Sequence, residues 1–191
     1  MKGLFEEAAS LQTTLENEGW EFFFVGGIAV QIWGEPRLTT DIDLTIFTGL
    51  VNENERVNGL LSILRPRDMS VAEAIEFSRQ SRMLLLISDS GLNIDMMLSG
   101  ITDLGEEYAR SSFQRFTPEI SLRVCSAETL VGMKTYAGRN RDIADVETVL
   151  IKQTKLDWDY IDRYLDEIAD YEDIQEKRSV LQALKEKYYR P

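Results

Sequence analysis

Hydrophobic and polar positions follow two different spacings along this chain, and the changes between them outline its elements. Apolar residues three or four positions apart are typical of amphipathic helices, whereas strict alternation is typical of half-buried strands. Alternating or short apolar runs predict strands over 20–25, 40–47, 82–88, 92–98 and 119–124. Helical spacing and helix-start residues predict helices over 4–18, 28–33, 71–79, 101–110, 127–137, 139–152, 158–168 and 172–188. The segment 48–58 is polar and is expected to run into a helix that ends by residue 64.

Two of the predicted strands carry acids on one face and apolar residues on the other. In the strand over 40–47, Asp41 and Asp43 are two positions apart, so both carboxylates project from the same face. In the strand over 92–98, Asp95 has the same parity relative to its apolar neighbours. We expect the three carboxylates to converge if these two strands lie side by side.

The balance of elements changes near residue 125. Strand-like segments dominate before this point and helical segments follow it, which predicts an α/β (α+β) core over residues 1–125. Residues 126–191 are predicted to form a helical C-terminal part packed on that core. No apolar run approaches the roughly 20 residues that span a bilayer, and the start of the chain lacks a signal-peptide core. We therefore expect a cytoplasmic protein without a membrane partner.

The residue types that are missing restrict the chemistry. The 191 residues include no histidine and one cysteine, Cys125. Ser-His and Cys-His nucleophiles are therefore excluded, as are His-ligated metals, an intrachain disulfide and a cysteine-cluster zinc site. Metal or acid–base chemistry has to use carboxylates, lysine, tyrosine or the backbone, and carboxylate oxygens suit Mg²⁺ or Mn²⁺. The net charge of −12 argues against a large DNA-binding surface, although it is compatible with a local basic cleft.

The acids and glycines of residues 26–43 have residue types suited to phosphoryl transfer. Neighbouring Asp41 and Asp43 repel each other unless a cation neutralises them, and Mg²⁺ binds through carboxylates together with substrate phosphates. Asp95 on an adjacent strand would complete a two-metal site and is the candidate general base. Gly26 and Gly27 lie at a strand-to-helix turn where backbone N–H groups can approach a phosphate. Taken singly, a glycine pair is often only a turn and an Asp-x-Asp is often solvated surface.

These residues resemble the signature of the DNA polymerase beta-like nucleotidyltransferase superfamily. Val-Gly-Gly is followed by thirteen residues and then by Asp-Ile-Asp-Leu, and Asp95 stands between apolar residues on a later strand. The fuller pattern, Gly-Gly-x-Ala with Arg37-x-Thr39-x-Asp41-Ile-Asp43, looks like the toxin-type nucleotidyltransferases of the abortive-infection (AbiEii-like) group. That group adds a helical lysine and a basic stretch with Asp-x-x-Asp, which resemble Lys134 and the segment 139–145.

The resemblance implies a fold and a role for each of these residues. It implies a polymerase-beta-like core with a small mixed sheet flanked by helices, in which Asp41, Asp43 and Asp95 are the catalytic, metal-binding acids. It also implies that the nucleotide is bound by the residues Gly26, Gly27, Arg37, Thr39, Lys134, Arg139 and Asp142. Lys134 is equally explained as an exposed helix lysine, Arg37 as a surface charge, and Asp142 with Asp145 as acids of a first helical turn.

The resemblance predicts an enzyme that transfers a nucleoside monophosphate from an NTP to an acceptor hydroxyl and releases pyrophosphate, with Mg or Mn as cofactor. The expected acceptor is RNA or a protein, as in a toxin–antitoxin system with an antitoxin partner. The alternatives are a small-molecule (antibiotic-type) nucleotidyltransferase and a non-catalytic module that binds a nucleotide or a partner. The acidic segment 157–176 is either a solvated helix face or a docking surface for a basic partner.

Overall fold

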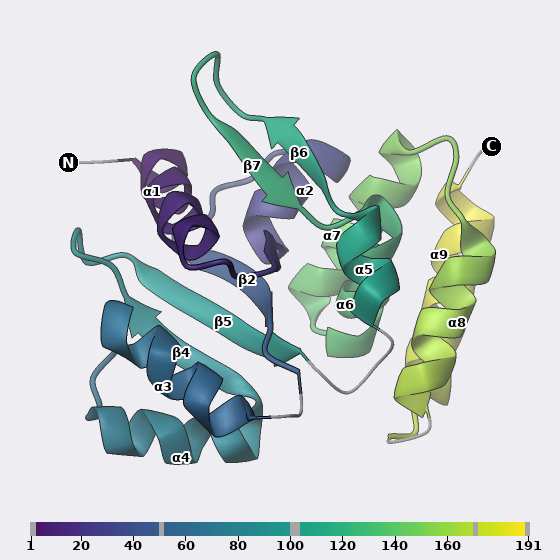
Figure 1. Ribbon diagram of the computed structural model, residues 1–191. Coiled ribbons are helices and arrows are strands. Elements are labelled where there is room, and N and C mark those ends of the chain that lie inside the picture. The colour runs from purple at the N-terminus through teal and green to yellow at the C-terminus, as the bar shows by residue number, and fades with distance from the viewer. Residues whose placement is uncertain (1–2, 50–51, 100–103, 170–171, 190–191) are drawn as a thin grey trace. The chain divides into compact units, whose positions relative to one another are not determined.

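The computed structural model of the protein describes residues 3–49, 52–99, 104–169 and 172–189 (Figure 1). The chain divides into two compact units. Unit 1 contains residues 1–28 and 38–124, and unit 2 contains residues 29–37 and 125–191. The expected domain boundary at residue 125 stays a prediction. The beginning of the helix expected over 101–110 lies outside the described residues, as do residues 50 and 51 of the expected polar segment.

A mixed sheet of seven strands forms the centre of unit 1 in the described part of the chain, in the order β3-β4-β5-β2-β1-β7-β6. β2 pairs in parallel with β5, and β1 in parallel with β7, whereas the remaining neighbours are antiparallel. This mixed sheet with flanking helices confirms the expected fold class. The strands are β1 (Phe22–Phe24), β2 (Ile42–Phe47), β3 (Arg65–Pro66), β4 (Met83–Ile87), β5 (Asn93–Ser99), β6 (Ser112–Arg115) and β7 (Ser121–Val124).

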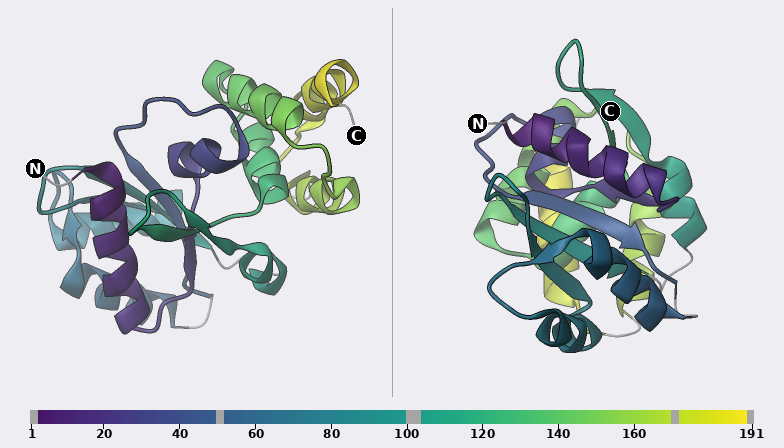
Figure 2. Two further views of the ribbon diagram at one scale, coloured as in Figure 1. Left: turned by 90° about the horizontal axis from the view of Figure 1, so that it is seen from above. Right: turned by 60° about the vertical axis from the view of Figure 1, so that its left-hand side comes forward.

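Helices pack on the sheet of unit 1, and Figure 2 shows three of them, α1, α3 and α4, on the same side of it. Helix α4 begins at a capping box, because the Ser70 hydroxyl accepts from the Glu73 backbone N–H at 3.3 Å while the Glu73 carboxylate accepts from the Ser70 backbone N–H at 2.8 Å. The helices are α1 (Leu4–Asn17), α3 (Glu53–Ile63), α4 (Val71–Ser81) and α5 (Leu104–Arg110), and α2 (Gly26–Trp33) begins in unit 1 and continues into unit 2.

The alternation in the central strands places a continuous apolar layer on one face of the sheet, and Thr45 and Phe47 on the other face of β2 are buried as well. On β2, Ile42, Leu44 and Ile46 are fully buried, and the apolar residues of β5 and β4 continue the same layer. Burying these side chains provides the main favourable free energy of this unit, at about 25 cal/mol per Å² of apolar surface. The two-residue period confirms that Asp43 lies on the opposite face. The continuing apolar residues are Leu84, Leu86, Ile94, Met96 and Leu98.

A side chain of helix α1 pairs with the part of β7 that the short strand β1 does not reach. The three-residue β1 pairs with β7 only at Phe24 and Val124. The Gln12 side-chain amide donates to the Ser121 carbonyl at 3.1 Å, and its oxygen accepts from the Arg123 backbone N–H at 2.9 Å. One side-chain amide therefore satisfies a donor and an acceptor that the short strand leaves unpaired.

Unit 2 consists of helices around the segment 29–37. Ser126 caps α6 by accepting from the Thr129 backbone N–H at 3.1 Å, and Gly138 ends the helix with a φ of 65°. The segment 29–37 is held by side chains: Lys152 donates to the Ile32 and Gly34 carbonyls at 3.0 and 2.9 Å. The helices are α6 (Ala127–Ala137), α7 (Asn140–Lys152), α8 (Trp158–Ala169) and α9 (Gln175–Tyr188).

Most expected elements are present, and the differences have physical reasons. Strands β3 and β6 were not expected, because one has two residues and the other, Ser-Phe-Gln-Arg, lacks an apolar run. Helix α2 begins at Gly26 and not at Ile28, so the glycines form its first turn and do not merely precede it. In the described residues, no helix is long and apolar enough to cross a membrane.

Candidate active site

The pairing of β2 with β5 brings two acids together. These strands are parallel neighbours, and their register sets Asp43 directly opposite Asp95. Residues opposite each other on neighbouring strands project from the same face, and their Cβ atoms are about 5 Å apart. The condition for the acids to approach each other, that these two strands lie side by side, is therefore met. Both side chains are partly exposed, on the face opposite the apolar layer.

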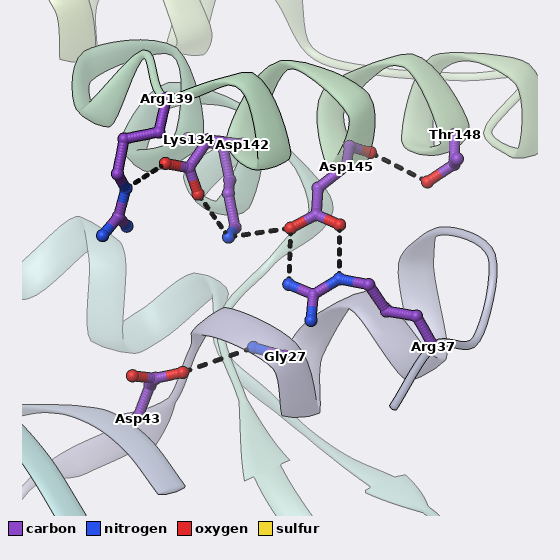
Figure 3. A network of polar contacts seen from close by, with 8 residues as sticks. All are labelled: Gly27, Arg37, Asp43, Lys134, Arg139, Asp142, Asp145 and Thr148. Carbon is purple, nitrogen blue, oxygen red and sulfur yellow. Dashed lines mark hydrogen bonds and ion pairs between the residues drawn. The ribbon is translucent and has the colours of Figure 1, made fainter. Parts of the chain in front are cut away.

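The glycine turn packs directly against one of these acids. The Gly27 backbone N–H donates to Oδ2 of Asp43 at 3.4 Å, as Figure 3 shows. Gly26 has a φ of +54°, and a Cβ atom built there would lie 2.0 Å from Oδ2 of Asp43. A Cβ atom on Gly27 would lie 2.3 Å from the Thr39 hydroxyl. Both positions therefore require glycine, and the turn, Thr39 and Asp43 form one closely packed group.

The other two acids have polar partners of their own. Asp41 immediately precedes β2, and its Oδ1 accepts from the Asn93 side-chain amide at 3.2 Å. Asp95 accepts from Nη2 of Arg67 at 2.9 Å through Oδ1. Among the described residues, no three acidic or sulfur side chains gather closely enough to form a metal-binding group. The expected convergence of all three carboxylates is not seen, and the assignment of these acids to metal binding stays a prediction.

The donor set nevertheless fits a hard divalent cation. Asp43 and Asp95 are register partners that present carboxylate oxygens from one face, and Asp41 is two residues from Asp43. Mg²⁺ and Mn²⁺ prefer oxygen ligands, and Mg²⁺ completes its octahedron with water and substrate phosphate. Two carboxylates held this close are stabilised by a cation between them, because like charges in neighbouring positions repel.

In unit 2, charged side chains of α6 and α7 form an ion-pair cluster with Arg37. The Lys134 ammonium contacts Oδ1 of Asp142 at 2.7 Å and Oδ2 of Asp145 at 2.9 Å (Figure 3). Arg37 binds Asp145 through both Nε and Nη2, each at 2.7 Å. Arg139 donates to Asp142 at 2.6 Å. The cluster contains three cations and two carboxylates, so its formal charge is positive.

Burial and pairing act in opposite directions on the acids of this cluster. The Asp142 side chain is 2% exposed and that of Lys134 is 10% exposed. Burial raises the pKa of Asp142, but hydrogen bonds from Arg139 and Lys134 outweigh it and hold the pKa below its ordinary value. Burial likewise raises the pKa of Asp145, but hydrogen bonds from Arg37 and Lys134 together have the larger effect. The pKa of Asp145 therefore also lies below its ordinary value.

The structure thus places the expected nucleotide-binding residues in two groups, each within one unit. Gly26, Gly27 and Thr39 lie beside Asp43 in unit 1, and the remaining residues belong to the ion-pair cluster of unit 2. Lys134 is not an exposed helix lysine, because it is buried between two carboxylates. The bidentate partner of Arg37 is a carboxylate of α7. The expected residues found in the cluster are Arg37, Lys134, Arg139 and Asp142.

Two polar partners in unit 1 were not found from the sequence. Asn93 contacts Asp41, and it could have been recognised because it shares the parity of Asp95 on the same strand. Arg67 contacts Asp95, although it lies 28 residues away and follows a strand of only two residues. No local pattern marks Arg67, since its position depends on how β3, β4 and β5 are paired.

Comparisons with known proteins show the family of the chain and proteins of similar fold. The chain matches, over residues 1–190, a family described as "Nucleotidyltransferase of unknown function (DUF6036)". An antigenic nucleotidyltransferase-like protein from Paracoccidioides brasiliensis has a similar fold, with a TM-score of 0.52 and 12% identity, over 96% of this chain and 92% of that protein. No curated protein matches the sequence.

Two further solved structures are similar. The lincosamide antibiotic adenylyltransferase LnuA, in its lincomycin-bound form, has a TM-score of 0.47 and 13% identity over 75% of this chain and 94% of that one. The antibiotic-resistance factor ANT(2'')-Ia has a TM-score of 0.47 and 15% identity over 92% and 91%. The expected toxin-type subgroup stays a prediction, whereas the superfamily fits the family match. The chain belongs to the nucleotidyltransferase family DUF6036.

Proposed function

We propose that this protein is a metal-dependent nucleotidyltransferase that transfers a nucleoside monophosphate from an NTP to an acceptor hydroxyl. The observation that carries the proposal is the parallel β2–β5 pair, which sets Asp43 beside Asp95 next to the glycine turn. Phosphoryl transfer depends mainly on positioning and electrostatic stabilisation, and this arrangement offers acids, backbone N–H groups and a tight turn.

In the proposed reaction, Asp95 is the general base. It removes the proton from the acceptor hydroxyl as the acceptor oxygen forms a bond to the α-phosphorus. The bond from the α-phosphorus to the oxygen that bridges to the β-phosphate breaks, and its electron pair leaves with pyrophosphate. The N–H groups at the start of α2 donate to phosphate oxygens, because a helix N-terminus carries a partial positive charge.

Asp41 and Asp43 are the residues that would hold Mg²⁺ or Mn²⁺, and Asp95 would complete the site beside them as the base. A divalent cation held there would supply positive charge that stabilises the charge developing on the phosphate. The glycine turn keeps Asp43 in place for this role, since its backbone N–H already donates to the Asp43 carboxylate at 3.4 Å.

We also propose that the ion-pair cluster of unit 2 binds a phosphate-bearing anion. Its three cations outnumber its two carboxylates, and the Arg139 side chain is 78% exposed, which leaves it accessible to a phosphate. Asp142 and Asp145 fix Lys134 and Arg37, so the cationic groups are ordered before any anion binds. Such preorganisation lowers the entropic cost of binding.

For the acceptor, the net charge of −12 favours a small or compact hydroxyl-bearing molecule over a long nucleic acid. RNA or protein acceptors, and an antitoxin partner, stay predictions that rest on the resemblance to toxin-type enzymes.

The experiment is to incubate the protein with each common NTP, labelled on the α-phosphate, in Mg²⁺ or Mn²⁺. Separate reactions contain small polyhydroxylated compounds, structured RNA or a protein mixture. We expect label in one acceptor class together with stoichiometric pyrophosphate, and at least about 100-fold slower transfer in Asp43→Asn and Asp95→Asn.

Asp89→Asn is the matched control, because it makes the same chemical change at an exposed acid in the β4–β5 turn. Its rate should stay within about twofold of the wild-type rate. Nucleotide binding without transfer to any acceptor class would contradict the enzymatic proposal and indicate a binding module.

A further inference from the structure

A row of side chains runs across β2, β5 and β4 to the residue that follows β3, on the face of the unit 1 sheet that carries the acids. Asp43 on β2 is opposite Asp95 on β5, and Asp95 is opposite Leu85 on β4. The β3–β4 register continues to the next residue, because the Arg67 backbone N–H donates to the Leu85 carbonyl at 2.9 Å. Residues opposite one another in a sheet project from the same face, so all four side chains share it.

Arg67 is long enough to reach past Leu85 to the acid on the next strand. Its Nη2 donates to Oδ1 of Asp95 at 2.9 Å, with side-chain exposures of 20% for Arg67 and 33% for Asp95. In the described residues, Oδ2 of Asp95 has no hydrogen-bond donor. The arginine therefore fixes one oxygen of the carboxylate and leaves the other accessible.

The Arg67 guanidinium offsets the repulsion between the carboxylates of Asp43 and Asp95. Asp43 and Asp95 are register partners of like charge, so the two carboxylates repel each other. A guanidinium on the far side of Asp95 opposes that repulsion and restricts the rotation of the carboxylate. Charge-assisted hydrogen bonds of this kind are also stronger and more directional than neutral ones.

We propose that Arg67 is the positioning residue of the general base: it holds Asp95 through Oδ1, so that Oδ2 receives the proton of the acceptor hydroxyl. This inference rests on the proposed function. Proton transfer to Oδ2 accompanies formation of the bond between the acceptor oxygen and the α-phosphorus, while the bridging oxygen leaves with pyrophosphate. Arg67 exchanges no proton and acts on the reaction only through Asp95.

The chain offers a matched control two residues away. Arg65 begins β3, two residues before Arg67, and is an exposed arginine whose guanidinium donates only a long 3.5 Å contact to the Ser88 carbonyl among the described residues. Arg65→Gln and Arg67→Gln therefore remove the same charge from positions two residues apart. Only the second change removes the contact with Asp95.

We expect Arg67→Gln to lower kcat by about 10- to 100-fold, the usual effect of removing a partner that orients a catalytic group. The KM for the NTP should change by no more than about twofold, since Arg67 does not bind the nucleotide. Arg67→Lys should retain part of the activity, and added guanidinium should restore part of it to Arg67→Ala. The thermal shift produced by Mg²⁺ and NTP should persist in Arg67→Gln, which establishes that the variant is folded.

The decisive measurement combines Arg67→Gln with Asp95→Glu, which keeps a carboxylate but displaces it by one methylene. If Arg67 acts through Asp95, the double variant is no slower than Asp95→Glu alone. Losses that multiply would overturn the inference and indicate direct contact with a substrate. Equal rates for Arg67→Gln and Arg65→Gln would overturn it as well. Failure of the proposed function is distinguishable, because the wild-type protein would then transfer no label to any acceptor.

Discussion

Lys134 illustrates how a single buried charge depends on its surroundings. Its ammonium group lies within 2.9 Å of two carboxylates, and each of these also has an arginine partner. Transferring an isolated ammonium out of water costs several kcal/mol, so the cluster is stable only when its partners are present together. Removing one member leaves the others buried without full compensation.

We therefore predict that Lys134→Met lowers the free energy of unfolding by about 2–3 kcal/mol. This value lies below the usual loss for a broken buried pair, because Asp142 and Asp145 each keep an arginine. Urea unfolding measures the change. Lys155→Met is the control, since Lys155 is an exposed lysine of the same unit, and it should change the free energy by no more than about 0.5 kcal/mol. Equal effects would show that the cluster contributes nothing beyond a surface charge.

The same residues predict a dependence of stability on pH. Burial raises the pKa values of Asp142 and Asp145, but their cationic partners lower them further, so both lie below the ordinary value of 3.8 in the folded state. The unfolded chain then binds more protons in this range, and stability rises with pH. The contribution is complete above about pH 4 and is lost as the pH falls through the folded-state values.

Thermal unfolding measured between about pH 5 and pH 2 tests this sign. The midpoint of the wild-type protein should fall steeply with acidification. Asp142→Asn and Asp145→Asn should start lower at pH 5 and fall less steeply, because each variant lacks one of the carboxylates. Parallel curves for variants and wild type would contradict the assignment.

At the scale of an element, the start of helix α2 joins local backbone geometry to the position of an acid. Gly26 combines a φ of +54° with a space that Asp43 fills, since an added Cβ would lie 2.0 Å from its carboxylate oxygen. Two effects therefore restrict the residue type at position 26: the left-handed backbone conformation and the contact with Asp43.

Gly19 separates these two effects. It ends helix α1 with a φ of +74°, and an added Cβ would meet no atom within 4 Å. Gly19→Ala should cost about 1 kcal/mol, the penalty of the backbone conformation alone. Gly26→Ala should cost about 2–4 kcal/mol and abolish transfer, because the methyl group displaces Asp43. Urea unfolding and the pyrophosphate assay measure the two quantities, and equal stabilities would show that the contact with Asp43 is unimportant.

The elements also show what the sequence can and cannot predict. Helices with long apolar stripes, such as α1 and α7, and the alternating strands β2 and β5 were expected, because one buried face imposes a regular period. The alternation also predicted that Asp43 and Asp95 would project from the same face if the two strands were neighbours, and they are register partners. Arg67 could not be inferred, since its contact with Asp95 requires two strand registers that no local pattern specifies.

On the scale of the whole molecule, the net charge of −12 opposes long polyanionic acceptors. We predict that any transfer to RNA accelerates when salt is raised from about 20 to 150 mM, because screening weakens the repulsion between like charges. A protein that binds RNA through a basic surface shows the opposite trend, with affinity falling as salt rises. Measurement of label transferred to RNA across this range, with a neutral small acceptor as control, distinguishes the two.

The contact of Gln12 with β7 limits how early unit 1 can fold while the chain is being synthesised. Gln12 and Ser121 are separated by 109 residues, so the two hydrogen bonds of the Gln12 side chain to β7 cannot both form until residue 123 has been synthesised. Strand β1 likewise cannot pair with β7, its parallel neighbour, until β7 has been synthesised. Contacts between residues so far apart in the sequence slow folding. We expect ribosome-bound chains that end before β7 to expose the sheet to proteases, and protection to arise only after residue 124 has emerged.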